Sequence, residues 1–295
     1  MKKLFHTEEI TYEIPFDFLL KEAEQGNEKA QYLLGQMYEK GTGIKPNYQK
    51  AVEWYTKAAE QGEIEAQFNL GNMYYNGEKI ERDYKKAVEY YTMAAKQNDI
   101  DAQFYLGYMY FYGDGVKKDY KKALKWYTKS AEQGHIAAQS CLGIMYDEGI
   151  GVKPDYQKAV EWYTKAAEQG DIDTQSNLGY MYVNGKGVKQ NYKKAREWFT
   201  KAAEQGKAEA QYNLGLIYIN GQGIKQNYKK AKEWFTKAAE QDLANAQYNL
   251  AVMYYNGNGG RSNLSLAKKW IGKACENGHK EACKKYKILD RLGIK

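Results

Sequence analysis

The sequence predicts an all-α protein built from seven copies of a helix-turn-helix repeat. The first observation is an internal repeat, because the dipeptide Ala-Gln or a close variant recurs every 36 residues along the 295-residue chain. The second is helical periodicity, since Ala66, Leu70, Met73 and Tyr74 follow the i, i+4, i+7, i+8 spacing of one helical stripe. The third is that apolar residues nowhere alternate with period two, which argues against strands.

Seven repeats follow one another in phase, without insertion or deletion. Their predicted boundaries are 27–62, 63–98, 99–134, 135–170, 171–206, 207–242 and 243–278. Residues 1–26 are expected to hold an N-terminal segment and a lone second helix, and residues 279–295 a lone first helix. These half repeats would cap the stack and shield its core from water.

Each repeat consists of a first helix, a glycine turn and a second helix. In the turn, a glycine such as Gly41 can adopt the left-handed conformation that ends a helix, and Asp119 is placed to cap the next one. Glycine inside a helix costs about 1 kcal/mol relative to alanine, so its recurrence in the first helix needs a cause. We expect a large Trp or Tyr of the second helix to pack on each of Gly35, Gly71, Gly107, Gly143, Gly179 and Gly215.

The two ends of the chain carry further expectations. The side chains of Ile10, Tyr12 and Ile14 are expected to fold over the N-terminal end. In the last helix, lysines replace apolar or glycine positions, which suits a helix with nothing stacked on one side. These lysines are Lys284, Lys285 and Lys287.

Composition narrows the class of protein. Apolar residues make up 43% and charged residues 27%, which is ordinary for a folded globular chain, and no stretch approaches the ~20 apolar residues of a membrane span. The first residues, Met-Lys-Lys-Leu-Phe-His-Thr-Glu-Glu, lack the apolar run of a secretory signal. Three cysteines are too few for a disulfide framework. We therefore expect a cytoplasmic protein, with delivery into a host cell left open.

The repeated pattern resembles the Sel-1-like repeat, a relative of the tetratricopeptide repeat. The matching residues read A-Q-x-x-L-G-x-M-Y-x-x-G-x-G-[IV]-K, then [ND]-Y-x-K-A, then W-[YF]-T-K-A-A-E-Q-G. The resemblance implies an α/α solenoid, in which antiparallel helix pairs stack into a right-handed superhelix. It also implies that the first helices line a concave groove and that the second helices form the convex side. It also implies adaptor roles in signalling, in assembly of complexes and in bacterial host interaction.

By the same resemblance, five positions of each first helix face the groove, namely 29, 32, 36, 39 and 40 of the first repeat and their equivalents. Aromatic residues concentrate there in the third repeat, and asparagines recur, whose amides can bond a peptide backbone. The candidate partner-binding residues are Phe68, Asn72, Tyr75, Asn76, Phe104, Tyr108, Phe111, Tyr112, Asp147, Glu148, Tyr180 and Asn184. The alternative is that these rings merely seal neighbouring helices. That reading suits any single tyrosine, and binding suits the cluster as a group.

The charges at these groove positions indicate which kind of partner would bind. The positions hold two lysines, Lys29 and Lys40. They hold seven acidic residues: Glu39, Glu65, Asp101, Asp147, Glu148, Asp173 and Glu209. An acidic, aromatic groove repels phosphates and favours a basic or aromatic protein segment, so nucleic acid is not expected in it. The chain as a whole carries a formal net charge of +7, with lysines recurring on the second helices. That face could contact anionic lipid or another protein.

The sequence offers little for catalysis. Its three histidines (His6, His135 and His279) form no repeated constellation with cysteines or carboxylates, so no catalytic residue, metal site or cofactor is predicted. Cys275 and Cys283 lie eight residues apart, a spacing that resembles the bridge in cysteine-rich secreted members of the family. Because the pair occurs once, we predict two reduced thiols packed close together.

Three functions remain in view. The first is a non-catalytic, monomeric scaffold or adaptor that binds a peptide or protein partner in its groove. The second is an immunity or inhibitor protein that caps one toxin or enzyme. The third, which the family resemblance implies, is a hydrolase of the penicillin-hydrolysing, cysteine-rich type. Such an enzyme would need a nucleophile and a base that the sequence does not offer.

Overall fold

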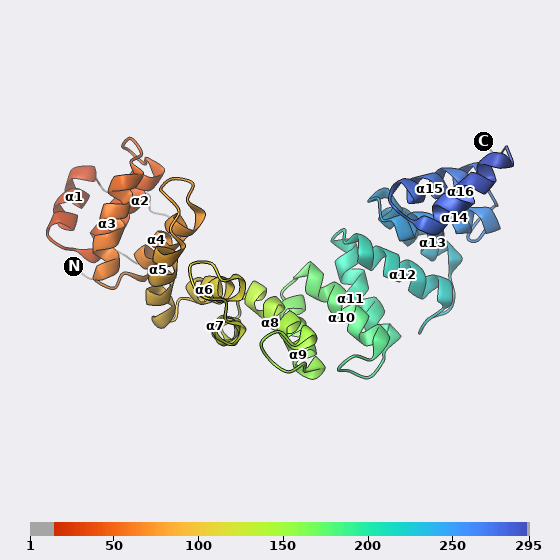
Figure 1. Cartoon of the computed structure of the whole chain (residues 1–295), viewed down its shortest axis with the longest axis horizontal. Helices are drawn as coiled ribbons and strands as arrows, with labels where there is room; N and C mark the ends of the chain where they lie inside the picture. The colour runs from red at the N-terminus through yellow and green to blue at the C-terminus, as the bar shows by residue number, and fades with distance from the viewer. Residues whose placement is uncertain (1–14, 294–295) are drawn as a thin grey trace. The chain divides into compact units, whose positions relative to one another are not determined.

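The computed structural model describes residues 15–293, which form sixteen α-helices and no strands (Figure 1). Ile10, Tyr12 and Ile14 lie outside the described residues. The chain divides into two compact units, Met1–His135 and Ile136–Lys295. The predicted fold class is confirmed: helical hairpins of about 36 residues repeat along an all-α, solenoid-like chain.

In the described part of the first unit, successive helices from α1 to α7 pack against one another. Even-numbered helices are the first helices of their repeats, and odd-numbered helices are the second. The helices are α1 (Phe16–Glu24), α2 (Glu28–Lys40), α3 (Tyr48–Glu60), α4 (Ile64–Asn76), α5 (Tyr84–Lys96), α6 (Ile100–Tyr112) and α7 (Tyr120–Glu132).

The second unit continues the same alternation, and successive helices from α8 to α16 pack against one another. Its helices are α8 (Ile136–Glu148), α9 (Tyr156–Glu168), α10 (Ile172–Asn184), α11 (Tyr192–Glu204), α12 (Ala208–Asn220), α13 (Tyr228–Glu240), α14 (Ala244–Asn256), α15 (Leu264–Glu276) and α16 (Lys280–Arg291).

The turns adopt the expected capping geometry. Gly41 follows α2 with φ of 75°, a left-handed conformation, and its N–H donates to the carbonyl of Met37. Asp119 then caps α7, where its carboxylate accepts a hydrogen bond from the N–H of Lys122 at 3.0 Å. These two devices fix where one helix stops and the next begins.

The glycines inside the first helices are explained by aromatic rings of the second helices. A Cβ atom built at Gly71 would lie 2.6 Å from the ring of Tyr91, and one at Gly215 would lie 2.5 Å from the ring of Phe235. The ring in contact is therefore the Tyr or Phe of the second helix, not the neighbouring tryptophan. Trp54, one residue before Tyr55, instead lies beneath the ammonium group of Lys57, 3.9 Å from the ring centroid.

The repeated glutamine of Ala-Gln connects one repeat to the next. The amide of Gln67 on α4 donates to the carbonyl of Ala59 at the end of α3, at 2.9 Å. Its side-chain oxygen accepts from Gln97 at the end of α5, at 2.9 Å. Because Gln67 is 2% exposed, both bonds are shielded from water. The same arrangement recurs at Gln31, Gln103, Gln175, Gln211 and Gln247.

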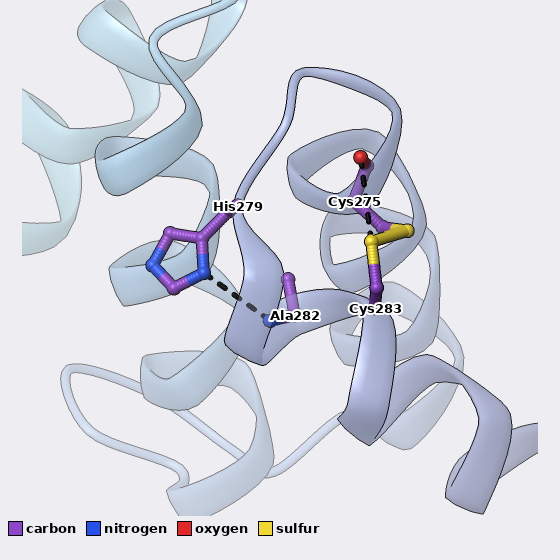
Figure 2. Close-up of a disulfide and its surroundings, with 4 residues drawn as sticks. All are labelled: Cys275, His279, Ala282 and Cys283. Carbon is purple, nitrogen blue, oxygen red and sulfur yellow. Dashed lines mark hydrogen bonds between the residues drawn. A yellow bond between two sulfur atoms is a disulfide. The ribbon is translucent and has the colours of Figure 1, made fainter.

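The last helix differs from two of our expectations. Cys275 at the end of α15 and Cys283 on α16 form a disulfide, with Cα atoms 4.5 Å apart, so the prediction of two reduced thiols is wrong (Figure 2). The eight-residue separation allows the bridge because the two helix ends meet at a short turn. Lys285 does not lie on an unstacked side, because its Nζ donates a hydrogen bond to the hydroxyl of Tyr248 on α14.

Candidate functional site

Three tyrosines on α4 and α6 form a row of touching rings in the first unit. The rings of Tyr75 and Tyr108 meet edge to face with centroids 6.3 Å apart, and those of Tyr108 and Tyr112 lie 4.4 Å apart. Tyr112 is 53% exposed, whereas Tyr75 and Tyr108 are half-buried. Burial raises the pKa of Tyr75, and the neighbouring Tyr108 raises it further. We call Tyr75, Tyr108 and Tyr112 the tyrosine row.

Two other aromatic candidates of this unit, Phe68 and Phe104, pack against rings of neighbouring elements. Phe68 contacts the rings of Tyr91 and Tyr105, both at 5.9 Å between centroids, and seals the contact between α4, α5 and α6. Phe104 stacks on His135 at 4.5 Å. Both phenylalanines thus fit the sealing alternative for individual rings.

Phe111 supports the tyrosine row from the side. Its ring lies 5.0 Å from Tyr112 and 5.2 Å from Tyr120, the first residue of α7. Tyr105 was not among the sequence candidates, although it stacks on Tyr91 at 5.3 Å and also meets Tyr75 at 6.3 Å. A signal was present, because Tyr105 stands where most other repeats have asparagine.

A small polar cavity of about 160 Å³ lies beside α4, the helix that carries Tyr75. It is lined by Glu39, Asn69, Asn72, Met73, Asn76, Glu78 and Lys79. The side-chain oxygen of Asn72 accepts a hydrogen bond from the Tyr91 hydroxyl at 2.8 Å, which orients its amide group. Glu39 accepts from the Tyr55 hydroxyl at 2.8 Å and pairs with Lys79 at 3.4 Å. Burial raises the pKa of Tyr55, and the bond to Glu39 adds to that.

The candidates of the second unit are placed separately. Asp147 forms an ion pair with Lys186 at 2.7 Å, and Glu148 is exposed. The ring of Tyr180 packs edge to face on Phe199, and its hydroxyl accepts from the amide of Asn213 at 2.7 Å. The amide of Asn184 donates to the carbonyl of Tyr180. These four residues therefore make mainly local contacts within α8, α10 and their neighbours.

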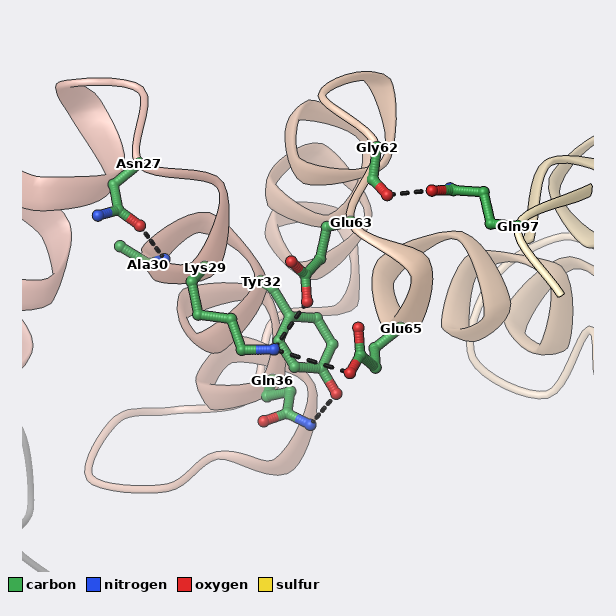
Figure 3. A network of polar contacts seen from close by, with 9 residues as sticks. All are labelled: Asn27, Lys29, Ala30, Tyr32, Gln36, Gly62, Glu63, Glu65 and Gln97. Carbon is green, nitrogen blue, oxygen red and sulfur yellow. Dashed lines mark hydrogen bonds and ion pairs between the residues drawn. The ribbon is translucent and has the colours of Figure 1, made fainter. Parts of the chain in front are cut away.

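Many of the acids counted on the first helices are paired. Figure 3 shows Lys29 between Glu63 at 2.8 Å and Glu65 at 3.8 Å. Burial alone would lower the pKa of Lys29, but its hydrogen bond to Glu63 and the two negative charges raise it overall. In the second unit, Lys207 pairs with Asp173 at 2.8 Å and Glu209 at 3.7 Å. Glu63 and Lys207 lie just before α4 and α12, outside the five positions counted from sequence.

The described residues contain no group of three or more His, Cys, Asp or Glu side chains arranged to hold a metal ion. Within residues 15–293, every helix is too short or too polar to cross a bilayer. His279 caps α16 through its Nδ1, which accepts from the N–H of Ala282 at 3.2 Å (Figure 2). That contact is structural.

Repeated hairpins with rings and amides presented on their first helices define a helical repeat protein. The model of the Sel1 repeat family matches seven times, at residues 28–63, 64–99, 100–135, 136–171, 172–207, 208–243 and 244–279. The chain belongs to the Sel1 repeat family.

Two solved structures are similar over nearly the whole chain. One is c5321, a protective antigen of uropathogenic Escherichia coli with an SLR fold, at 40% identity and a TM-score of 0.88; the match covers 94% of this chain and 60% of that one. The other is a Sel1 repeat protein from Oxalobacter formigenes, at 34% identity and a TM-score of 0.73, covering 93% and 79%. The chain thus spans 60% of the length of c5321. No curated protein matches.

Proposed function

We propose that this protein is a non-catalytic scaffold that binds an extended segment of a partner protein across the first helices of its first unit. The tyrosine row is the observation that carries the proposal. Tyrosine offers a large, rigid contact surface with a polar tip, and such residues are frequent anchors at protein interfaces. Sel1 repeat proteins generally mediate protein–protein interaction, which agrees with this role.

The neighbouring polar cavity supports an extended peptide as the ligand. Asn72 and Asn76 lie one turn apart on α4, and Tyr75 lies between them in sequence. A carboxamide donates and accepts, as a peptide backbone requires. In this proposal the rings bind side chains of the partner and the amides bind its main chain.

The charges of the cavity favour a partner with basic side chains. Glu39 and Glu78 line it together with one lysine, Lys79. A guanidinium or ammonium group can also lie over the face of a tyrosine, with a contribution of about 0.5–2 kcal/mol. A partner segment that carries an arginine or lysine close to an apolar side chain would suit both the cavity and the tyrosine row.

Selection from a displayed library of random peptides tests the proposal. We expect enriched sequences to contain basic and aromatic residues. Truncation of an interface anchor costs about 2 kcal/mol or more, so the double substitution Tyr108→Ala, Tyr112→Ala is expected to weaken peptide binding at least about tenfold. Adding Phe111→Ala should weaken it further, with a modest loss of stability because Phe111 is half-buried.

The control variant removes two exposed tyrosines of the second unit. Tyr156 and Tyr228 begin second helices and are 43% and 38% exposed. The double substitution of these residues to Ala should leave peptide affinity unchanged. Equal affinity of the wild type and the Tyr108, Tyr112 variant would refute the proposal. Unfolding of that variant would show that the rings serve as core, and a single milder change, Tyr112→Ser, would then decide.

A further inference from the structure

A second, apolar cavity lies in the second unit, between α14, α15 and α16. Its volume is about 410 Å³, within the range of ~300–1,000 Å³ that is usual for small-molecule sites. It is lined by Ala251, Val252, Tyr255, Asn256, Ala267, Ile271, Lys285, Ile288, Leu289 and Leu292. None of these residues belongs to the tyrosine row or to the polar cavity of the first unit.

The cavity follows from one exchange of residues that sets the seventh repeat apart. In the six preceding repeats, a glycine of the first helix faces a Tyr or Phe ring of the second. The seventh repeat has Ala251 and Ile271 at these two positions. Ile271 is smaller than the ring that it replaces, and the space that the ring would fill lies open above it. Ala251 and Ile271, 1% and 4% exposed, form the floor.

The walls of the cavity are apolar and reach the surface. Ile288 on α16 and Leu292, which follows the last residue of that helix, are 54% and 69% exposed. Covering them with an alkyl chain would remove apolar surface from water, at about 25 cal/mol per Å².

Lys285 is the charged residue among those that line the cavity. Its ammonium group donates one hydrogen bond to the Tyr248 hydroxyl. An ammonium has three N–H donors, so two further donors remain for a ligand, and an anionic acceptor would be favoured. The carboxamide of Asn256 stands on the same rim.

We propose that this cavity binds an aliphatic monocarboxylate, with its alkyl chain over Ile271, Ile288 and Leu289 and its carboxylate on the ammonium of Lys285. The site is held in place before the ligand arrives. The disulfide between Cys275 and Cys283 fixes the start of α16, two residues before Lys285. His279 stacks on Tyr248 at 4.3 Å and holds the partner of Lys285. Such preorganisation lowers the cost of binding.

Titration with decanoate, followed by calorimetry and by methyl NMR, tests the proposal. We expect saturable binding with shifts of the Ile271, Ile288 and Leu289 methyl signals. Lys285→Met keeps the apolar stem and removes the charge, so decanoate affinity should fall about tenfold or more. Decanol binding, which needs no cation, should change less than threefold.

A cavity-filling variant provides a test that does not weaken the fold. Ala251→Gly with Ile271→Phe reproduces the pair Gly215 and Phe235 of the sixth repeat. This variant should keep or raise the melting temperature and lose decanoate binding. Retained affinity in either variant, or shifts that avoid the three methyl signals, would overturn the proposal.

Two other occupants have distinct signatures. A peptide that ends in leucine also carries an aliphatic side chain and a free carboxylate; if it binds and decanoate does not, the monocarboxylate proposal fails. Self-association detected by sedimentation, and abolished by Ile288→Asp, would show that a second copy covers the cavity and would equally refute it.

Discussion

A Cβ atom at position 143 would lie 2.3 Å from the ring of Tyr163, so the hairpin of α8 and α9 closes only around a glycine. Equivalent contacts recur in six repeats, with distances of 2.3 to 2.7 Å. Close packing of an aromatic ring of the second helix on the backbone of the first helix is thus common to the hairpins of these six repeats.

Gly143→Ala should therefore destabilise the protein, although alanine is the better helix former. Overpacking costs about 1–3 kcal/mol, against about 1 kcal/mol gained in helix propensity. We expect the melting temperature to fall by about 2 °C or more. Adding Tyr163→Ile, which imitates Ala251 and Ile271, should cost less than the two changes taken separately. A rise in melting temperature for Gly143→Ala alone would contradict the packing described.

The disulfide of the last helix gives a second prediction. Closing a loop of eight residues stabilises a folded chain by about 2–3 kcal/mol in the chain-entropy model. Replacing both Cys275 and Cys283 by serine should increase amide hydrogen exchange in α16 while leaving the first unit unchanged. Mass spectrometry after thiol trapping measures the bridge directly. Disulfides persist mainly in oxidising compartments, so a quantitative bridge would argue against the cytoplasmic location expected from the sequence.

His135 gives a pH-dependent prediction. Burial lowers its pKa below the usual 6.5, and Asp101, 3.4 Å away, opposes that shift. The unfolded chain therefore takes up the proton more readily than the folded one. Stability should be constant above about pH 6.5 and fall as the pH drops through the lower, folded pKa. NMR titration of the imidazole signals should give a pKa below 6.5, and Asp101→Asn should lower it further; an increase would show the opposite balance.

The buried glutamines give a fourth prediction. Gln103 is fully buried, donates to the Ala95 carbonyl at 3.2 Å and accepts from Gln133 at 2.8 Å. Gln103→Leu would remove both hydrogen bonds and leave the Ala95 carbonyl with the N–H of Asn98 alone, at a cost of about 1–3 kcal/mol in urea unfolding. Gln133→Leu should cost less, because its side chain is exposed. Equal losses for the two variants would argue against the connecting role.

The local elements could be predicted from the sequence because each depends on neighbours within one repeat. The spacing of Ala66, Leu70 and Met73 defines a helix face, and Asp119 lies directly before the helix that it caps. The choice between tryptophan and the following tyrosine could not be predicted, since adjacent residues differ by one helical step of 100°. Only the packed hairpin shows that Tyr91 meets Gly71.

Contacts between repeats were harder to predict, and the candidate site depends on them. The sequence offered Tyr75 and Tyr108 only as members of one aromatic group, and the edge-to-face contact of their rings across α4 and α6 is visible only in the structure. The pairing of Asp147 with Lys186 joins a helix to a turn 39 residues later, so a count of helix positions missed it. The apolar cavity occupies space that a Tyr or Phe ring would fill if it stood in place of Ile271. The sequence shows the exchange of residues, but only the packed helices show that a cavity results.

The glutamine bonds have a consequence for how such a chain can change in length. Each of these glutamines takes one partner from the preceding hairpin and one from its own, at fixed separations of 8 and 30 residues. Adding or deleting a whole 36-residue block would restore both partners at the new junction, whereas any other change in length would strand a buried amide. Genes that encode this architecture are therefore expected to gain or lose whole 36-residue repeats more readily than shorter segments.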